Sequence, residues 1–472
     1  MTTTVSTEKN VQRVFIEQQK NRYVVAQTSY SERKAKLNRL LDAVMNSKEA
    51  IREALYKDYQ KNPSEVDLTE IYPVTNEIKH ALSHLRNWLQ TKSVSTPLAL
   101  MGSSSYIKYE PKGVVLLISP WNFPFNLTFA PLISAIAAGN CVMIKPSEMT
   151  PHTSALMAKM VSDLFPENEI SVIEGDASVA KELLDLPFNH IFFTGAPSIG
   201  KVVMAAAAKN LTSVTLELGG KSPTIIDETA SMASTAKRIA WAKFLNNGQI
   251  CIAPDYIFVH ENRKEEFVQL VKENIAAFYG ENPEGNVSYN RIVNSRHFER
   301  IKSYMDDAVL RGAKILHGGR MNSATNYIEP TLVTDVEDDS KLMTEEIFGP
   351  ILPIKTFKNL SEVTDFINKG EKPLALYIYS KSNKNIDFVL NNTRAGGSVI
   401  NHSAMHFFNN NLPFGGSNNS GIGKSHGFFG FEAFSDARGV LRQHLPISAI
   451  ELMMPPYSNL KQKMIDLTIR WF

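Results

Sequence analysis

The sequence predicts an α/β protein with two sheet-containing domains, and three observations support that prediction. The chain has 472 residues, more than one hydrophobic core usually organises. With 43% hydrophobic and 21% charged residues it has the composition of a folded globular protein. From Gly113 onward, short apolar runs alternate with helix-like stretches, a pattern typical of parallel sheets covered by helices.

The first hundred residues are predicted to be helical and to pack on later parts of the chain. In the clearest helix, apolar side chains recur at helical spacing from Val74 to Leu89. Thr75 or Asn76 is the expected N-cap, because a side-chain oxygen there can accept from a free backbone N–H.

Two series of strands and helices are predicted next. The first has strands at 114–118, 141–144, 171–173, 190–193 and 214–216, with helices near 127–138, 152–164, 177–185 and 198–209. The second has strands at 224–226 and 256–259, with helices at 232–245, near 262–278 and around 298–309. Two α/β domains in series follow from this order.

The net charge, the N-terminal sequence and the number of cysteines exclude several classes of function. Lys plus Arg is 50 and Asp plus Glu is 48, so the net charge of +2 gives no reason to expect a nucleic-acid partner. The polar N-terminus lacks a secretory signal, and two cysteines cannot form a disulfide framework, so we expect a cytoplasmic protein. The uncharged stretch 113–144 is interrupted by prolines and is predicted to be buried strand, loop, helix and strand, so no membrane span is expected.

A short amphipathic helix is predicted at the C-terminus, over residues 460–472. Leu460, Met464, Leu467 and Trp471 fall on one of its faces. We expect this face to dock on the protein itself; a weak membrane-surface contact is the alternative.

Chemistry-bearing residues follow several predicted strands, where parallel sheets bind ligands. Asn122 follows the first strand, Lys145 and Glu148 the second, a Gly195-to-Gly200 turn the fourth and Glu217 the fifth. A glycine turn before a helix can hold a phosphate on backbone N–H groups.

Cys251 lies in a loop between a helix and a strand, which suits a nucleophile. A thiol needs a nearby base or dipole to react, and Glu217 is the candidate base. Cys141 lies inside an apolar run and is predicted to be a core residue.

Other site types fit less well. Two glycine-containing turns resemble the loop that binds nucleotide triphosphates, but neither matches its pattern. Val202 stands where the first needs a Ser or Thr, and Asn418 stands where the second needs its first glycine. The GxGxxG dinucleotide signature is absent. His402 and His406 have zinc-ligand spacing, but Ser403 stands where a zinc protease needs Glu, so no metal is expected.

Taken together, these motifs resemble the aldehyde dehydrogenase superfamily. The matching segments are PWNFP at 120–124, KPSE at 145–148, FTG at 193–195 with Gly200, ELGG at 217–220, GQIC at 248–251, EIFGP at 346–350 and PFGG at 413–416. The segment 246–256, VIN at 399–401 with His406 and PPY at 455–457 resemble the class 3 branch, which includes fatty and aromatic aldehyde dehydrogenases.

The resemblance implies a fold class and a division of the chain. It implies a Rossmann-like NAD(P)-binding domain plus an α/β catalytic domain with a small β oligomerisation arm. The implied limits are 1–99 and 113–217 for the NAD(P)-binding domain, 218–421 for the catalytic domain, 100–112 and 422–446 for the arm and 447–472 for a tail helix.

The resemblance also implies the mechanism. Cys251 would attack the aldehyde, Asn122 would stabilise the oxyanion, and Glu217 would be the base that activates water against the thioester, with Glu346 as a rival. The implied cofactor-binding residues are Lys145, Glu148, Gly195, Gly200, Glu346, Phe348 and Trp121. Glu148 beside a ribose 2′-hydroxyl would repel a 2′-phosphate, so NAD is favoured and NADP stays possible.

The implied function is oxidation of medium- or long-chain aliphatic or aromatic aldehydes to carboxylic acids. An acylating enzyme that transfers the acyl group to coenzyme A is the alternative; a nucleotide triphosphatase and a non-catalytic homologue fit the residue set less well. The resemblance also suggests a homodimer, joined through a hairpin near 104–109 and a strand near 439–442. Aromatic and Met residues near 404–408 suit aliphatic and aromatic chains equally.

Overall fold

The apolar runs that begin at Val114 form one sheet in the computed structural model, which describes residues 2–471. Its strands lie in the order β17-β7-β6-β3-β4-β5, and the neighbours from β7 to β5 are parallel. The strands are β3 (Val114–Ile118), β4 (Cys141–Lys145), β5 (Ile170–Val172), β6 (His190–Gly195), β7 (Ser213–Leu218) and the antiparallel β17 (Gly421–Ile422). This doubly wound order confirms the predicted fold class.

Helices cover both faces of this sheet because its central strands are apolar on both faces. Val115 and Leu117 of β3 belong to one buried cluster, whereas Val114 and Leu116 belong to another. The first cluster includes side chains of α2 (Tyr30–Asn46), α3 (Lys48–Tyr59), α5 (Tyr72–Trp88), α6 (Asn126–Ala138) and α7 (Pro151–Leu164). The second includes side chains of α1 (Thr2–Ala26), α8 (Ala177–Leu184) and α9 (Pro197–Ala208).

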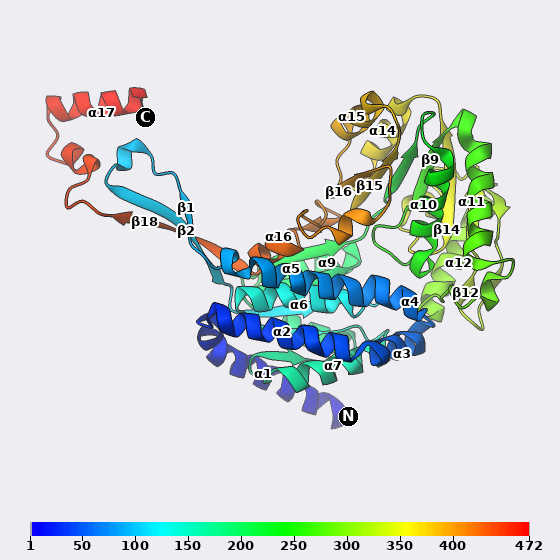
Figure 1. Cartoon of the computed structure of the whole chain (residues 1–472), viewed down its shortest axis with the longest axis horizontal. Helices are drawn as coiled ribbons and strands as arrows, with labels where there is room; N and C mark the ends of the chain where they lie inside the picture. The colour runs from blue at the N-terminus through cyan, green and yellow to red at the C-terminus, as the bar shows by residue number, and fades with distance from the viewer. Residues whose placement is uncertain (1, 472) are drawn as a thin grey trace.

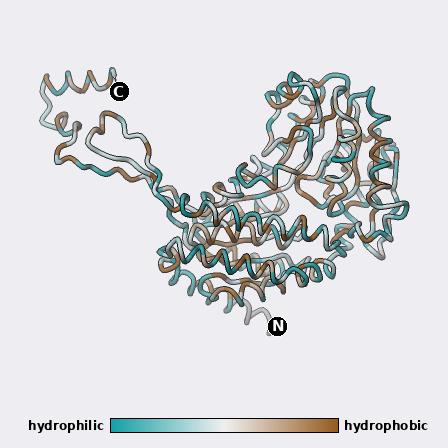
Figure 2. The backbone as a smooth tube through the Cα atoms, in the orientation of Figure 1, coloured by the Kyte–Doolittle hydropathy of each residue, from teal (hydrophilic) through white to brown (hydrophobic). Residues whose placement is uncertain are grey.

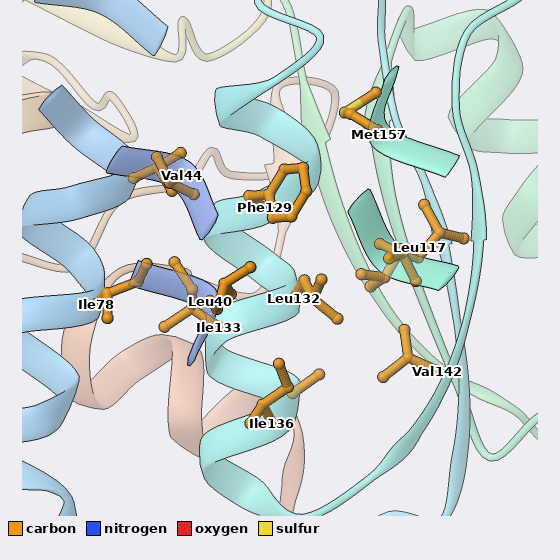
Figure 3. Packing of buried hydrophobic residues seen from close by; sticks show 14 of the residues in the cluster. Leu40, Val44, Ile78, Leu117, Phe129, Leu132, Ile133, Ile136, Val142 and Met157 are labelled. Atoms are coloured by element: carbon orange, nitrogen blue, oxygen red, sulfur yellow. The ribbon is translucent and has the colours of Figure 1, made fainter. Parts of the chain in front are cut away.

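The core beneath the N-terminal helices joins segments far apart in the sequence. Figure 3 shows Leu40 and Val44 of α2 beside Ile78 of α5 and several side chains of α6, with Leu117 of β3 and Val142 of β4 beyond them. A fully buried side chain of this size stabilises the fold by about 1.5–3 kcal/mol. The prediction that the first hundred residues pack on later elements is therefore confirmed.

The predicted N-cap of the helix at 74–89 is wrong. The chain enters α5 already helical, through α4 (Pro63–Val66) and a π-helical turn at Asp67–Ile71. Thr75 consequently lies inside α5, where its hydroxyl donates to the carbonyl of Tyr72. A side chain caps a helix only where no helical turn precedes it.

A second sheet follows, in the order β10-β13-β14-β9-β8-β15-β16. Its strands are β8 (Pro223–Ile226), β9 (Tyr256–His260), β10 (Lys314–His317), β13 (Thr331–Thr334), β14 (Ile351–Phe357), β15 (Ala375–Tyr379) and β16 (Gly397–Ile400), and only β10 pairs antiparallel. Its helices are α10 (Met232–Phe244), α11 (Lys264–Tyr279), α12 (Ser295–Leu310), α13 (Lys341–Thr344), α14 (Leu360–Lys369) and α15 (Asn383–Asn392), with a small ribbon of β11 (Met321–Asn322) and β12 (Tyr327–Ile328). The prediction of two α/β units in series is confirmed.

A thin arm projects from the first unit (Figure 1). It is an antiparallel sheet of β1 (Lys92–Val94), β2 (Ser103–Pro111) and β18 (Ser435–Gln443), in which Ser103 pairs with Gln443. The short helix α16 (Gly427–Ala433) joins β18 to the body. The arm thus pairs the segment near 104–109, which was predicted to form a hairpin, with the segment near 439–442, which was predicted to form a strand.

The C-terminal helix forms as α17 (Asn459–Trp471), and the part of the protein that it contacts is the short helix Ala449–Met453 rather than the body. Figure 1 places α17 at the far end of the arm, and no residue of the helix is buried. Leu460, Leu467 and Trp471 are all exposed, and Figure 2 shows apolar and polar positions alternating along the helix. Helical periodicity predicts an apolar face, but not what covers that face.

The uncharged stretch 113–144 forms β3, α6 and β4, as predicted. Over residues 2–471, no helix combines the length and hydropathy needed to cross a membrane.

Candidate active site

A cleft of about 1110 Å³ lies where loops of the two sheets meet. The predicted site residues that line it are Trp121, Asn122, Gly195, Glu217, Cys251, Glu346 and Phe348. Lys145, Glu148 and Gly200 do not line it. The structure therefore brings the three predicted catalytic residues together, along with part of the predicted cofactor set.

A left-handed turn places Cys251 at the cleft. After α10, Asn246, Asn247 and Gly248 have φ angles of 51°, 57° and 72°. A Cβ at Gly248 would lie 2.3 Å from the carbonyl oxygen of Gly349, so only glycine fits there. The run Asn-Asn-Gly suits this backbone, because these residue types tolerate positive φ.

Buried amides hold Asn122 against the same turn. The Asn122 Nδ2 donates to the carbonyl of Gln249 at 3.0 Å. The backbone carbonyl of Asn122 accepts hydrogen bonds from Asn246 Nδ2 and from the Tyr59 hydroxyl, both at 2.9 Å. An amide NH₂ carries two hydrogens, so the second N–H of Asn122 is available to a ligand.

The Cys251 thiol lies in an environment that favours its neutral form. Burial raises its pKa above the ordinary range, and the carboxylates of Glu346 and Glu217 raise it further. The backbone N–H groups of Cys251 and Ile252 act in the opposite direction. A base is therefore needed to ionise this thiol. Cys141 is fully buried in β4, as predicted, and burial raises its pKa to about 12.

Glu217 is a buried carboxyl at the end of β7, and burial raises its pKa to about 8. Its Oε1 accepts a hydrogen bond from the Ser425 hydroxyl at 2.9 Å, whereas its Oε2 has no partner. The positive charge of Lys424 opposes the rise. Such a carboxyl is poised to take up and release a proton near neutral pH.

Glu346 is a second carboxyl that lines the cleft. Burial and the charge of Asp255 raise its pKa to about 8, and its Oε1 has no partner. Its carboxyl lies directly over Gly219, where an added Cβ would lie 2.2 Å from Oε2. The free oxygen is a ready acceptor for a hydroxyl of a bound ligand.

Phe348 and Trp121 pack against each other at the rim, with ring centroids 5.3 Å apart. Phe348 has a φ of 47°, and its carbonyl accepts from Arg300 at 3.3 Å. Arg300 also donates to the carbonyls of Glu346 and Ile347. This one guanidinium thus holds the loop that carries both Glu346 and Phe348.

The remaining predicted residues have local partners. Lys145 Nζ donates to Glu148 Oε2 at 2.7 Å; Lys145 is the last residue of β4, and Glu148 follows that strand. Gly200 is buried in α9, where an added Cβ would lie 2.7 Å from Leu218. Gly200 therefore allows α9 to pack closely on β7.

Several residues at the site were missed by sequence reasoning. Ser425 belongs to one of the two near-miss nucleotide loops, and its contact with Glu217 spans 208 residues of sequence. Tyr377 donates to the carbonyl of Ile252, next to Cys251. For the histidine pair, both ring nitrogens of His406 lack partners, and no group of three metal-ligand side chains occurs in the described part of the chain.

Comparisons with known proteins give a consistent result. The family model described as "Aldehyde dehydrogenase family" matches residues 1–440. The chain is similar to the 4,4'-diaponeurosporen-aldehyde dehydrogenase of Staphylococcus aureus, with 44% identity over 427 residues that cover 90% of this chain and 92% of that protein. It is similar to aldehyde dehydrogenase family 3 member A2 of Mus musculus, with 42% identity covering 90% of this chain and 87% of that protein. The solved substrate-bound state of Staphylococcus aureus AldH matches with a TM-score of 0.93 and 42% identity, over 97% of this chain and 99% of that one.

Proposed function

The chain belongs to the aldehyde dehydrogenase family and oxidises aldehydes with NAD(P), and on that premise we propose that Cys251 is its nucleophile, Asn122 its oxyanion donor and Glu217 its base. The products proposed are carboxylic acids. The observation that carries this assignment is the presence of all three residues in one cleft.

In the proposed first step, the ionised Cys251 sulfur attacks the aldehyde carbon. The resulting thiohemiacetal oxygen accepts hydrogen bonds from the second N–H of Asn122 and from the Cys251 backbone N–H. A donor fixed beforehand loses little energy to rearrangement, and one such donor contributes roughly 10²–10³-fold to the rate. Asn122 is fixed in this sense by the bonds to Gln249, Asn246 and Tyr59.

Loss of a hydride from the thiohemiacetal carbon to the nicotinamide would leave a thioester on Cys251. In the proposed next step, water hydrolyses this thioester. Glu217 takes a proton from that water, the water oxygen bonds to the acyl carbon, and the carbon–sulfur bond breaks to give the acid and the Cys251 thiolate. The unpartnered Oε2 of Glu217 supports this role, because it can accept from a water while Ser425 holds Oε1.

Residues of this chain fit the nicotinamide cofactor. The turn at Gly195 lines the cleft at the N-terminus of α9, where backbone N–H groups can face a pyrophosphate. We propose that Glu346 accepts from the nicotinamide ribose, that Phe348 and Trp121 border the ring, and that Lys145 and Glu148 reach the adenosine ribose from the end of β4. When bound, the nicotinamide supplies a hydride acceptor.

We propose medium- or long-chain aliphatic or aromatic aldehydes as substrates. The cleft is lined by Leu127, Phe407 and Phe414 beside Cys251, which suits an apolar chain or ring. The Staphylococcus aureus relative, whose printed name is 4,4'-diaponeurosporen-aldehyde dehydrogenase, supports an aldehyde substrate. Neither the site geometry nor the matches reported above favour the coenzyme A alternative.

We also propose that the chain forms a homodimer through its arm. The distal apolar patch, formed by exposed side chains at the end of the arm, supports this, because monomers rarely leave such a surface uncovered. The patch comprises Leu98, Met101, Leu441, Leu445, Ile447, Leu452, Leu460, Leu467, Ile469 and Trp471. Sedimentation of the full chain should give a dimer, and a chain ending at His444 should dissociate more readily; a monomeric full chain would contradict the proposal.

The test of function is NAD(P) reduction by the purified protein with octanal, benzaldehyde and acetaldehyde, with and without coenzyme A. Faster turnover of octanal or benzaldehyde than of acetaldehyde, without coenzyme A, is expected. Turnover only when coenzyme A is present would instead support the acylating reaction.

A further inference from the structure

The cleft continues past Glu217 to a second buried carboxyl that the proposed mechanism does not use. This is Glu77 on α5, which lines the same cleft as Glu217 and Cys251 and is only 4% exposed. A buried carboxyl without a charged partner weakens a fold unless its site is hydrated or it stays neutral. Burial raises the pKa of Glu77 to about 7, so it exchanges protons near neutral pH.

Glu217 and Glu77 flank the same short segment of chain. Ser425 donates its hydroxyl to Glu217 Oε1 at 2.9 Å, and two residues later the backbone N–H of Gly427 donates to Glu77 Oε1 at 2.8 Å. Ser134 lines the same cleft, and its hydroxyl would lie 2.3 Å from a Cβ added at Gly430. Two carboxyls and two hydroxyls therefore reach a cleft that is wide enough for water.

Two histidines continue this line to the surface. Glu77, His80 and His84 are spaced three and four residues apart on α5, so they share one face of the helix. His80 Nε2 would lie 3.0 Å from a Cβ at Gly427, the residue whose N–H contacts Glu77. The rings of His80 and His84 stack with centroids 4.2 Å apart, and His84 is exposed.

His84 is the member of this set that is exposed to solvent. Its Nδ1 lies 2.9 Å from the carbonyl oxygen of His80 and 2.8 Å from the Ser83 hydroxyl. An imidazole has two ring nitrogens, so it can take a proton on one and release a proton from the other.

We propose that Glu77, His80 and His84 form the proton outlet of the active site. This inference rests on the proposed function, in which hydrolysis leaves a proton on Glu217 and a thiolate on Cys251. Glu217 has to lose that proton before it can act as a base in the next turnover, so the proton has to leave the site. It passes through water, Ser425 and Ser134 to Glu77, then through His80 and His84 to solvent.

The relative acidities of the two carboxyls agree with this route. Burial raises the pKa of Glu217 to about 8 and that of Glu77 to about 7, so a proton moves from one to the other at little cost. The other charged group acting on Glu217 is Lys424, which lies on the side of the Ser425 segment. For Glu77, the hydrogen bond from the Gly427 N–H is the contact that opposes the rise in pKa.

The test is stopped-flow NAD(P)H formation from octanal by Glu77→Gln. Glutamine keeps the acceptor for Gly427 N–H but carries no exchangeable acidic proton. We expect an unchanged first turnover, a steady-state rate lowered roughly tenfold, and recovery of that rate as imidazole buffer is added, because a small base replaces the lost relay. Glu53→Gln, an exposed glutamate on α3, is the matched control and should behave like the wild type throughout.

A second variant keeps the proposal testable if Glu77→Gln folds poorly. The double variant His80→Asn with His84→Asn changes residues nearer the surface and should show the same slow, imidazole-restored steady state. A wild-type steady-state rate in either variant, or a loss that imidazole does not restore, would overturn the outlet. Failure of the wild-type protein to reduce NAD(P) with any aldehyde would instead refute the proposed function.

Discussion

Replacing Asn246 by alanine should loosen both halves of the proposed catalytic centre at once. The Asn246 side chain donates to the carbonyls of Asn122 and Gln249, at 2.9 and 3.2 Å, and accepts from Asn290 Nδ2 at 2.9 Å. These bonds tie the oxyanion donor to the turn that carries Cys251. Alanine removes all of them without altering either proposed catalytic side chain.

The size of the effect follows from the partners left behind. The carbonyl of Asn122 keeps the Tyr59 hydroxyl and that of Gln249 keeps Asn122 Nδ2, whereas Asn290 loses its acceptor. Each lost hydrogen bond costs about 1 kcal/mol, and an unsatisfied buried donor adds about 1–3 kcal/mol. With three bonds lost, the expected loss in the free energy of unfolding is therefore about 4–6 kcal/mol.

Alanine at position 246 also introduces backbone strain. Asn246 has a φ of 51°, which costs an alanine roughly 1 kcal/mol more than it costs a glycine. Asn246→Gly should therefore lose the same hydrogen bonds with less strain. Asn21→Ala is the matched control, because Asn21 donates one exposed hydrogen bond to Asn168 far from the cleft and should cost less than about 1 kcal/mol.

The assay combines urea unfolding with steady-state kinetics. We expect kcat for octanal to fall about tenfold to a hundredfold in Asn246→Ala, less than when an oxyanion donor is removed outright, with little change in the KM for NAD(P). Wild-type stability and kcat in Asn246→Ala would refute the positioning role. A raised KM for NAD(P) with unchanged kcat would equally contradict it.

Three further predictions concern buried groups. Gly219→Ala should raise the KM for NAD(P) about tenfold in initial-rate kinetics, because its Cβ would displace the Glu346 carboxyl; an unchanged KM would contradict that role. Glu217 has a raised folded-state pKa, so the folded protein binds more protons than the unfolded chain between about pH 4.5 and 8 and loses stability as pH rises through that window. Glu217→Gln should therefore raise Tm at pH 8 but not at pH 4, while abolishing the rise of hydrolysis with pH; equal Tm differences at both pH values would contradict this. Lys61→Met should destabilise the protein by about 3–5 kcal/mol in urea unfolding, because it strands the buried Glu70 carboxylate, and adding Glu70→Gln should recover most of the loss; no recovery would mean that the pair is not coupled.

Periodicity and composition were enough to predict the five parallel strands of the first sheet and two strands of the second, β8 and β9, for a clear physical reason. A strand buried on both faces, such as β3 or β4, must be apolar at every position, so its residues are recognisable without tertiary information. Helices that cover it need an apolar stripe, which predicts α12 nearly to its ends and the C-terminal end of α5.

Features that depend on neighbours distant in sequence could not be predicted in this way. The start of α5 was misplaced because the preceding turns are themselves helical. The apolar face of α17 predicted docking on the protein itself, but such a face does not reveal which segment it contacts. Both points concern the surroundings of an element rather than its type.

The candidate site shows the same limit. Asn122, Glu217 and Cys251 could be brought together from sequence, because the first two follow parallel strands and the third follows a helix-breaking turn. Ser425 could not, since its bond to Glu217 joins residues 208 positions apart. Glu77 was hidden among the residues of an ordinary amphipathic helix, and only the cleft reveals where its carboxyl lies.

The most direct test of the central claim compares the wild type with Cys251→Ala in NAD(P) reduction by octanal, with Cys141→Ala as the control for loss of a thiol. Cys141 lies buried in β4, away from the cleft, so its variant should keep most activity if it folds. The nucleophile assignment predicts no octanal oxidation by Cys251→Ala under conditions where the wild type and Cys141→Ala are active. Octanal oxidation by a folded Cys251→Ala at the wild-type rate would contradict it.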